Sequence, residues 1–431
     1  MARTIVCFGP GPVFKGGLSN YNTSLAKALA AEPDTVVYII SWTQQYPSII
    51  PREFKDKSSK LDFLAGTNIR CEYITNFNNP FSWGRTVRRI AELRPDTVIF
   101  QWSIALQGWP LRSILKGLKK VGGIELIMDL HFVVQKEKSA IDKFFTRYCL
   151  PQADTYIVHA LKTYEELKTV FPTQKFYLTE IGTRAADKAK GEKTVIKLYH
   201  PIYDLFQPVP NLDIEKFKTT HNLKKNVFLF FGFIRKYKGL HQAIEAFKIV
   251  SEQRDEVSLL IAGESFWNTL DSTSWTTKIK QFLFGIAKKL FLNGSDDEQN
   301  YKPLELIKSY GLEDKVTVLN RFIPNEEVPP LFQVSDCVVL YYLTATPSGV
   351  ESLSYNFNLP ILATKVGHFP ETVVHGFNGY LAEDRDIKSM SEQMLHFLDT
   401  PIPRANVAKT SEKLSWANYA KAILGTLESG E

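Results

Sequence analysis

The sequence predicts two α/β domains, each built on a doubly wound parallel sheet, that face each other across a cleft. Short β-branched and aromatic runs alternate with amphipathic segments through both halves of the chain, the pattern of strand–helix–strand units. The length of 431 residues suits two domains of about 200 residues each better than one. Hydrophobic residues make up 44% of the chain, which is enough for two large cores.

Eleven runs are predicted to be buried strands, and amphipathic helices are predicted between them. Leu18–Leu29 and Leu240–Val250 are the clearest helices, because each places its large apolar residues on one face. Ligands of such sheets bind outside the carboxyl ends of the strands. The predicted strands are Thr4–Phe8, Thr35–Ile40, Asn68–Ile74, Thr97–Gln101, Ile124–Leu130, Tyr156–His159, Val227–Phe231, Val257–Ile261, Val316–Leu319, Cys337–Tyr341 and Pro360–Ala363.

The domain boundary is predicted near His200–Pro210, where three prolines fall in a polar stretch. This gives an N-terminal domain over 1–200 and a C-terminal domain over 201–404. Within the remaining 405–431, Ser411–Leu427 is expected to form one helix.

Composition excludes several classes of protein. The net charge of +6 is too small to argue for nucleic acid, although it suits anionic substrates or membrane surfaces. The four cysteines form no CxxC pair, so neither a zinc site nor a disulfide framework is predicted, and a cytoplasmic location fits best. The N-terminus reads as a first strand, not a signal peptide, and no apolar run approaches the ~20 residues of a membrane span.

Two strand ends carry the chemistry of an anion site. The strand Val227–Phe231 leads into a loop that begins at Gly232, and Arg235 and Lys238 are expected to project from it towards the cleft. Cations of this kind match the concentrated charge of a diphosphate. A solvated turn with ordinary surface cations is the plainer alternative, and we adopt it for Lys236.

The second anion site is predicted at a helix start, where free N–H groups and the helix dipole favour a phosphate. Ser348, Gly349 and Val350 follow the strand that ends at Tyr341. Ser348 and Glu351 also have the spacing of a capping box, so we assign Glu351 to capping and Gly349 and Val350 to phosphate.

The first strand leads into a glycine-rich loop that contains Gly16 and Gly17, which would let the backbone approach a ligand. A dinucleotide fingerprint would need a small residue where Phe14 stands, and the second strand ends in Ser41–Trp42 with no acidic residue for a ribose. Binding of NAD is therefore disfavoured.

Four runs together resemble glycosyltransferase family 4, whose members have the GT-B fold: "FLFFGFIRKYKGL", "LLIAGE", "LYHPIYDLF" and the stretch from "IPNEEV" to "HGFNGYL". The resemblance covers nearly the whole chain and is strongest between about residues 195 and 385. It implies a sugar transferase that uses a nucleoside diphosphate sugar of UDP or GDP type. The acceptor would be a glycan or a lipid-linked molecule, and the reaction retaining, without metal or cofactor.

The resemblance also assigns roles to residues. Arg235 and Lys238 would hold the diphosphate, and the loop of Gly16 and Gly17 would face the phosphate and the sugar. His131, at the end of the strand Ile124–Leu130, would lie against the donor sugar at the reacting centre, although a structural histidine is the alternative.

Further assignments concern the nucleotide side of the site. Glu371 matches the glutamate of a glycine–proline–glutamate stretch that binds the sugar donor. Glu264 lies at another strand end and would line the nucleotide pocket, with a surface carboxylate as an equal alternative. In the acceptor half, Gln101, Trp102 and Trp109 could frame an acceptor sugar, but buried aromatic packing explains them better.

The sequence departs from the family at two positions. Most members carry two glutamates eight residues apart before the "LP" strand, and Ala345 and Leu353 stand there instead. The first glutamate normally contacts the donor sugar, so the sugar is left open. The DxD pair of Asp384 and Asp386 begins a predicted helix and is explained by capping.

Two segments outside these motifs have expected roles. Residues 275–292 form a basic amphipathic helix that could lie on the inner face of a membrane, on the domain surface or on another subunit. By resemblance, the C-terminal helix would cross back to the first domain. Two other functions stay open: a weakly active GT-B scaffold that assists a partner transferase, and a sugar-nucleotide epimerase.

Overall fold

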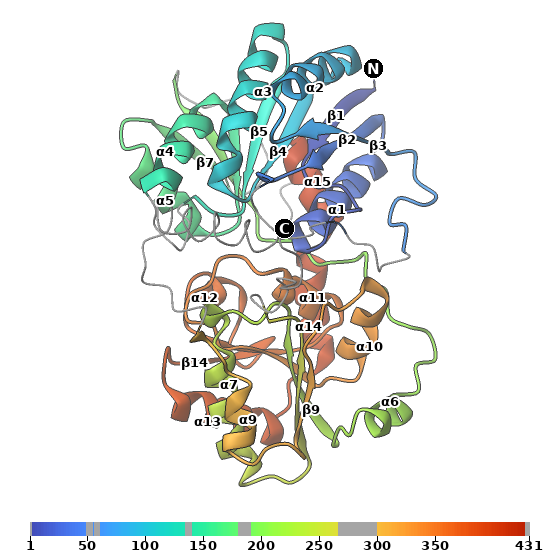
Figure 1. The fold of residues 1–431 in the computed structure, drawn as a ribbon, viewed down its shortest axis with the longest axis vertical. Coiled ribbons are helices and arrows are strands. Elements are labelled where there is room, and N and C mark those ends of the chain that lie inside the picture. Colours follow the sequence, from blue (N-terminus) through green and yellow to red (C-terminus); the bar gives the residue numbers. More distant parts are fainter. Residues whose placement is uncertain are drawn as a thin grey trace, which may run out of the picture.

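The computed structural model describes residues 2–48, 55, 61–133, 140–179, 191–265 and 300–426. They form two α/β domains stacked along the long axis of the molecule (Figure 1). Each domain is one parallel sheet with helices on both faces, as the sequence predicts.

The N-terminal domain contains an eight-stranded sheet in the order β3-β2-β1-β4-β5-β6-β8-β7, with parallel pairing throughout. The order reverses between β1 and β4, and a crevice opens beyond the carboxyl ends of strands at such a point. The strands are β1 (Arg3–Phe8), β2 (Thr35–Gln44), β3 (Arg70–Asn76), β4 (Thr97–Trp102), β5 (Glu125–Leu130), β6 (Thr155–Val158), β7 (Phe176–Thr179) and β8 (Lys193–Lys197).

The C-terminal domain repeats this plan with six parallel strands in the order β11-β10-β9-β12-β13-β14. The order reverses between β9 and β12, as it does between β1 and β4 in the N-terminal domain. The strands are β9 (Asn226–Phe231), β10 (Val257–Ala262), β11 (Val316–Leu319), β12 (Cys337–Leu340), β13 (Ile361–Thr364) and β14 (Gly379–Ala382).

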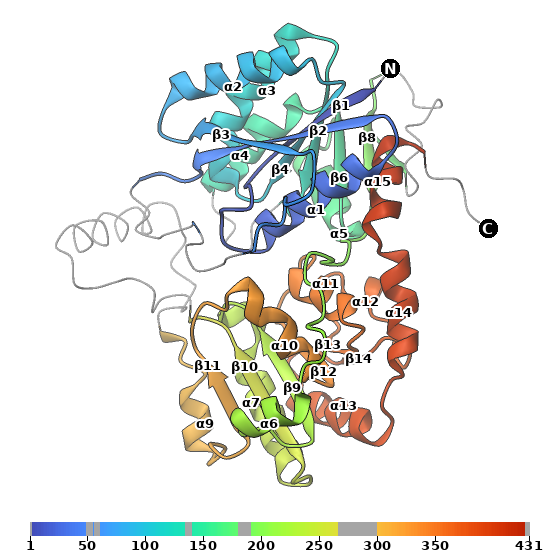
Figure 2. The same ribbon diagram turned by 90° about the vertical axis from the view of Figure 1, so that its right-hand side faces the viewer.

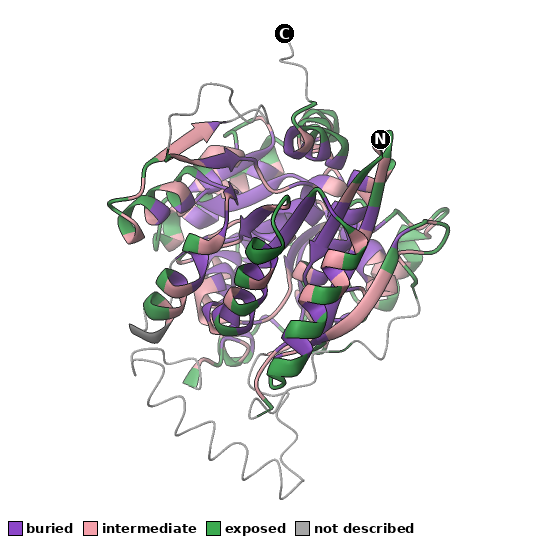
Figure 3. Cartoon of the chain, turned by 90° about the horizontal axis from the view of Figure 1, so that it is seen from above, coloured by how far each residue is buried: buried purple, intermediate pink, exposed green. Residues whose placement is uncertain are grey.

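The helices cover both sheets (Figure 2), and Figure 3 shows that their exposed turns face outward while the central strands are buried and edge strands are partly exposed. In the N-terminal domain they are α1 (Gly17–Ala31), α2 (Pro80–Leu93), α3 (Gly108–Val121), α4 (Ala140–Cys149) and α5 (Leu161–Val170). The others are α6 (Ile214–Thr220), α7 (Leu240–Ser251), α9 (Glu305–Ser309), α10 (Val328–Gln333), α11 (Gly349–Asn356), α12 (Phe369–Thr372), α13 (Ile387–Asp399), α14 (Arg404–Lys413) and α15 (Trp416–Leu424).

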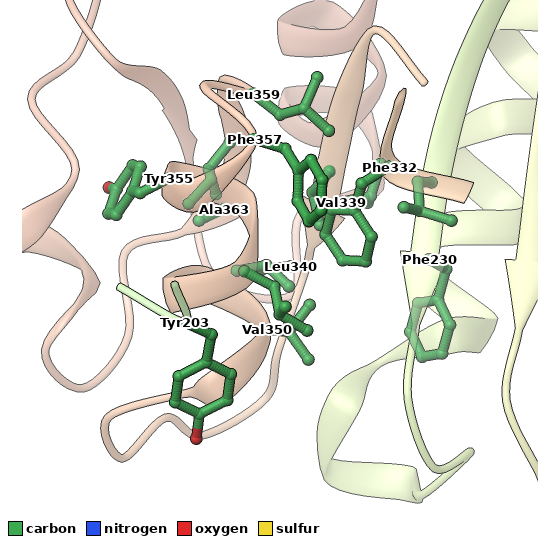
Figure 4. Packing of buried hydrophobic residues seen from close by; sticks show 14 of the residues in the cluster. Tyr203, Phe230, Phe332, Val339, Leu340, Val350, Tyr355, Phe357, Leu359 and Ala363 are labelled. Carbon is green, nitrogen blue, oxygen red and sulfur yellow. The ribbon is translucent and has the colours of Figure 1, made fainter. Parts of the chain in front are cut away.

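The core of the C-terminal domain fixes the position of α11. The rings of Phe332 and Phe357 stack with their centroids 5.3 Å apart, and Phe357 directly follows α11 (Figure 4). Phe230, Val339 and Leu340 of the neighbouring strands are at most 1% exposed. This packing holds the first turn of α11 above the carboxyl ends of β9 and β12.

The C-terminal segment forms two helices, so the prediction of one helix over Ser411–Leu427 is wrong. The first helix, α14, ends at Lys413. Ser415 then caps α15 by accepting a hydrogen bond from the backbone N–H of Asn418. α15 packs against α1 of the N-terminal domain (Figure 2). The serine cap replaces the helical bond that would have continued α14.

Three strands were not predicted: β7, β8 and β14. No helix within the described residues is long and apolar enough to cross a membrane. The segment 275–292, for which a membrane contact was predicted, lies outside the described residues.

Candidate active site

A cavity of about 370 Å³ lies between the two domains, beyond the carboxyl ends of both sheets. Nine of the predicted site residues line it: Gly16, Gly17, His131, Gly232, Lys238, Glu264, Ser348, Gly349 and Val350. Arg235 and Glu371 are not among the lining residues.

Lys238 supplies the buried cation of the cavity. It ends a short 3₁₀ helix after β9, and its side chain is 8% exposed. Gly232 has a positive φ of 94°, and a Cβ there would come within 2.7 Å of the Lys238 Nζ, so only glycine leaves room for the ammonium. Burial, aided by the charge of Arg235, lowers the pKa of Lys238 to about 8. A bound anion would favour the charged form.

Arg235 adds a second positive charge just outside the cavity lining. Its guanidinium lies over the ring of Tyr237, 5.4 Å from the centroid, and it is close enough to Lys238 to lower the pKa of that lysine. Tyr237 itself lines the cavity. The two cations therefore lie on one side of the space.

The first turn of α11 lies beside Lys238, since a Cβ at Gly232 would approach both the Lys238 Nζ, at 2.7 Å, and the Val350 side chain, at 3.6 Å. Ser348 caps the helix, with its Oγ accepting a hydrogen bond from the Val350 backbone N–H at 3.3 Å. The helix start thus presents its positive dipole end to the same cavity as Lys238.

The assignment of Glu351 to capping is wrong. Its carboxylate is 5% exposed and accepts hydrogen bonds from His368 Nε2, at 2.5 Å, and from the Thr372 hydroxyl. A buried carboxylate needs such donors, and they come from His368, the N-cap of α12, and from Thr372, its last residue. Glu351 therefore ties α11 to α12 behind the first turn of α11.

Tyr203, which the sequence reasoning did not single out, lies between the two helix starts. Its hydroxyl donates a hydrogen bond to the Gly17 carbonyl oxygen at 3.0 Å. A Cβ would approach this hydroxyl to 2.9 Å at Gly17 and to 2.7 Å at Gly349. Both glycines are therefore needed for Tyr203 as well as for any ligand that approaches the backbone.

His131 lines the cavity from the N-terminal domain. Its Nε2 lies 2.7 Å from Gln101 Oε1, and its ring stacks on His159 at 5.2 Å. Burial, aided by His159 and opposed by Asp129, lowers the pKa of His131 to about 4. The imidazole is therefore neutral near pH 7. In this form one ring nitrogen donates a hydrogen bond and the other accepts one.

A buried hydrogen-bond network lies behind His131. Asp129 Oδ1 accepts from His159 Nε2 at 2.7 Å, and Oδ2 accepts from the Tyr21 hydroxyl at 2.8 Å. The Tyr21 hydroxyl also lies 2.6 Å from that of Tyr419 on α15. Burial tends to raise the pKa of Asp129, but His159, His131 and the hydrogen bond from Tyr21 together outweigh burial, so the pKa is lowered.

The ligand atoms of Asp129, His131 and His159 lie within 4.8 Å of one another, close enough to hold an ion. However, both oxygens of Asp129 accept hydrogen bonds, and His159 Nδ1 faces the Leu198 carbonyl oxygen at 3.1 Å. The cluster is thus occupied by its own hydrogen bonds. His200 also lines the cavity, and its Nδ1 lies 2.7 Å from Ser352 Oγ.

Glu371 contacts the other domain. Its Oε2 accepts a hydrogen bond from the backbone N–H of Leu161, the first residue of α5, at 3.2 Å. The same oxygen lies 3.9 Å from Lys197 Nζ in β8. The carboxylate joins α12 of the C-terminal domain to the N-terminal domain.

The remaining wall of the cavity is mostly apolar and aromatic, as expected of a site that holds a flat ring. Leu353 lines it and Ala345 is 1% exposed, so neither glutamate position of the family supplies a carboxylate here. The aromatic and apolar lining includes Phe206, Phe231, Phe233, Phe322, Ile323 and Tyr342.

The family comparison decides the class of the C-terminal domain. Residues 212–414 match the family model "Glycosyl transferases group 1". This part of the chain is similar to group 1 glycosyltransferases. This confirms the predicted enzyme class, whereas membership of family 4 stays a prediction.

Two characterised relatives match parts of the chain. Spore coat protein SA of Bacillus subtilis (strain 168) is 23% identical over 212 residues, which are 47% of this chain and 49% of that protein. N-acetyl-alpha-D-glucosaminyl L-malate synthase of Bacillus anthracis is 30% identical over 113 residues, or 26% and 29%. The chain thus spans about half or less of the length of these relatives.

Solved structures match the whole fold. Anabaena HepE, in complex with UDP and glucose, has a TM-score of 0.65 at 15% identity, with 99% of this chain and 100% of that chain covered. A UDP-forming trehalose-phosphate synthase from Burkholderia xenovorans has a TM-score of 0.64 at 12% identity, with the same coverage. The predicted GT-B fold is confirmed.

Proposed function

We propose that this protein transfers a sugar from a nucleoside diphosphate sugar of UDP type to a hydroxyl group of a glycan or lipid-linked acceptor. It would be a family 4 enzyme that retains the anomeric configuration and needs no metal ion or other cofactor. The observation that carries the proposal is that Lys238 and the first turn of α11 line one cavity side by side.

The residues divide the reaction between the domains. Lys238 and Arg235 would neutralise the diphosphate as the bond to the sugar breaks, since charge grows on the leaving group at that moment. The capped start of α11 would bind a phosphate through its backbone N–H groups. Neutral His131 would hydrogen-bond the sugar or the acceptor hydroxyl, because it carries no charge that would need compensation.

The nucleotide base would lie against the apolar wall formed by Phe231, Phe233 and Phe322. A flat ring gains from contacts with aromatic side chains. UDP is named with two structurally similar proteins, HepE and the UDP-forming trehalose-phosphate synthase, and this supports a uridine donor.

The test is binding followed by product analysis. Thermal stabilisation is measured with UDP, GDP, ADP and their sugars for wild type, Lys238→Ala and Arg235→Ala. Lys236→Ala is the matched control, because Lys236 lies between the two cations in the sequence. UDP should stabilise wild type and the control, and each of the other variants should lose at least about tenfold in affinity.

Products of a UDP-sugar panel then separate the functions. A new glycoside supports transfer, an isomerised nucleotide sugar supports an epimerase, and tight UDP binding without turnover supports a scaffold. Stabilisation by no nucleotide in any variant would refute the proposed donor site.

A further inference from the structure

The helices α2, α3 and α4 carry the basic character of the protein. Together they contain nine basic and two acidic residues, a net charge of +7, whereas the whole chain has +6. The rest of the chain is therefore close to neutral. The three helices pack side by side on one face of the N-terminal sheet, so the charge is gathered on one surface (Figure 1).

Seven of these cations are exposed: Arg85, Arg88, Lys116, Lys119, Lys120, Lys143 and Arg147. Lys119 pairs with Asp154 at 3.4 Å. The two acids do little to offset them. Glu92 pairs with Arg89 at 3.3 Å, and Asp142 is only partly exposed. The surface thus presents a positive field to any large partner.

The same surface exposes large aromatic side chains. Phe81 on α2 is 87% exposed, Trp109 on α3 is 55% exposed and Phe144 on α4 is 60% exposed. The interpretation of Trp109 as buried packing is therefore wrong. Exposure of three large aromatic residues on adjacent helices is unusual for a surface that meets only water.

Ring contacts join these residues into one surface. Trp109 meets Trp83 edge-on at 5.8 Å, two residues from Phe81. On the other side, the Arg112 guanidinium lies 3.8 Å from the centroid of the Tyr148 ring, and Tyr148 stacks on Phe144 at 5.5 Å. The side chains are held in place, which lowers the entropy that is lost when a partner binds.

We propose that this aromatic–cationic surface of α2, α3 and α4 docks on an anionic lipid bilayer. Lysine and arginine are attracted to anionic headgroups, while phenylalanine and tryptophan insert at the headgroup boundary. If a second copy of the chain bound here, a two-fold axis would place the same cations of both copies against one another, and they would repel. A soluble polyanion would bind the cations, but it would leave the exposed ring of Phe81 without an apolar partner.

The placement of the surface also bears on the acceptor. α2 follows β3 and α3 follows β4, so both helices start at the carboxyl edge of the sheet, where the cavity lies. Phe81 and Trp109 are each the second residue of their helix. If the proposed transfer is correct, a bilayer at this surface delivers a lipid-linked acceptor to the side of the cavity.

The test is sedimentation with vesicles of phosphatidylcholine, with and without phosphatidylglycerol, in the absence of any sugar donor or acceptor. Wild type should bind only the vesicles with phosphatidylglycerol, and the fluorescence of Trp109 should shift to the blue. The pair Phe81→Ser and Trp109→Ser should weaken binding about tenfold, and Arg85→Glu with Lys116→Glu about hundredfold.

Matched controls come from the C-terminal domain. Ile214→Ser with Val374→Ser removes exposed apolar residues, and Lys216→Glu with Lys225→Glu reverses exposed charges. Both pairs should bind vesicles like wild type. UDP stabilisation, measured on every variant, shows that the fold is intact and tests the sugar-donor site separately.

Three outcomes would overturn the inference. Wild type could fail to bind anionic vesicles, or the controls could lose as much binding as the surface variants. Binding that is indifferent to Phe81→Ser with Trp109→Ser, and that heparin abolishes, would mark a general polyanion surface instead of a bilayer site.

Discussion

The Tyr203 hydroxyl donates a hydrogen bond to the Gly17 carbonyl oxygen at 3.0 Å, across 186 residues of sequence. Tyr203 follows the domain boundary, Gly17 begins α1, and Gly349 begins α11 on the other side of the same ring. The linker thus places one side chain between the two helix starts that face the cavity. Gly17 and Gly349 leave room for the Tyr203 hydroxyl, and the same space would let a ligand approach the backbone.

Gly17→Ala should destabilise the protein by about 1–2 kcal/mol, because its Cβ would lie 2.9 Å from the Tyr203 hydroxyl. The other atoms of the Tyr203 ring lie at least 3.7 Å from that position, so Tyr203→Phe should restore most of the loss. Urea unfolding of the two single variants and the double variant measures the coupling. Additive losses would show that the alanine acts through the backbone alone.

Binding of UDP should weaken at alkaline pH because of Lys238. Its pKa is lowered to about 8 in the unliganded protein, and an anion binds the ammonium form. The dissociation constant should be flat below about pH 7 and rise up to tenfold per pH unit above about pH 8. Titration calorimetry from pH 6 to about pH 10 measures this slope. Lys238→Arg should bind with no alkaline rise, and a rise that persists in that variant would assign the effect elsewhere.

Gln101→Glu should make His131 titrate in the neutral range. The wild-type imidazole has a pKa lowered to about 4, and a carboxylate 2.7 Å from its Nε2 would raise that pKa by stabilising the imidazolium. NMR titration of the histidines should show one resonance moving to a higher pKa. Any sugar transfer should then fall as the pH drops through that value.

Gln101→Leu is the matched control for that substitution. It removes the hydrogen-bond acceptor without adding charge, so the pKa of His131 should stay low. A rise in both variants would mean that water entry, not the carboxylate, changes the titration.

Glu371→Ala should loosen the contact between the domains and leave UDP binding intact. Its carboxylate accepts from the Leu161 N–H and lies near Lys197, but it does not line the cavity. Loss of this contact should cost about 1–3 kcal/mol and widen the distribution of domain angles. Small-angle scattering with and without UDP measures the second effect.

Glu383→Ala is the control for Glu371, because Glu383 pairs with Lys365 on the surface of the C-terminal domain. Loss of UDP binding in Glu371→Ala, with scattering unchanged, would favour the donor-binding role that the family resemblance implies.

Long apolar runs made most of the fold predictable. β9 and β10 differ from their predicted bounds by one residue, because each is a nearly continuous buried run. β7, β8 and β14 have only four or five residues, and β8 begins with Lys193 while β14 begins with Gly379. Length alone does not explain the omission, because β6, β11, β12 and β13 also have four residues and were predicted. Lysine and glycine have low strand propensity, and neighbouring strands determine the structure of these segments.

The same limit applies to the site. Lys238 and His131 each follow a strand, one in each domain. They line the same cavity because both parallel sheets direct their carboxyl ends towards it. Tyr203 and Glu351 depend on contacts between separate elements, which no local pattern encodes. The donors to Glu351 lie on α12, so its S-x-x-E spacing favoured the wrong partner.

The chain passes between the domains twice, and the two passages touch. Ile202 in the first passage donates its backbone N–H to the carbonyl oxygen of Leu414 in the second, at 3.0 Å. Two connections that are joined at one edge of the interface resist twisting of one domain against the other more than they resist opening and closing about that edge. We therefore expect the cavity to open and close as a hinge on the side where Ile202 and Leu414 lie.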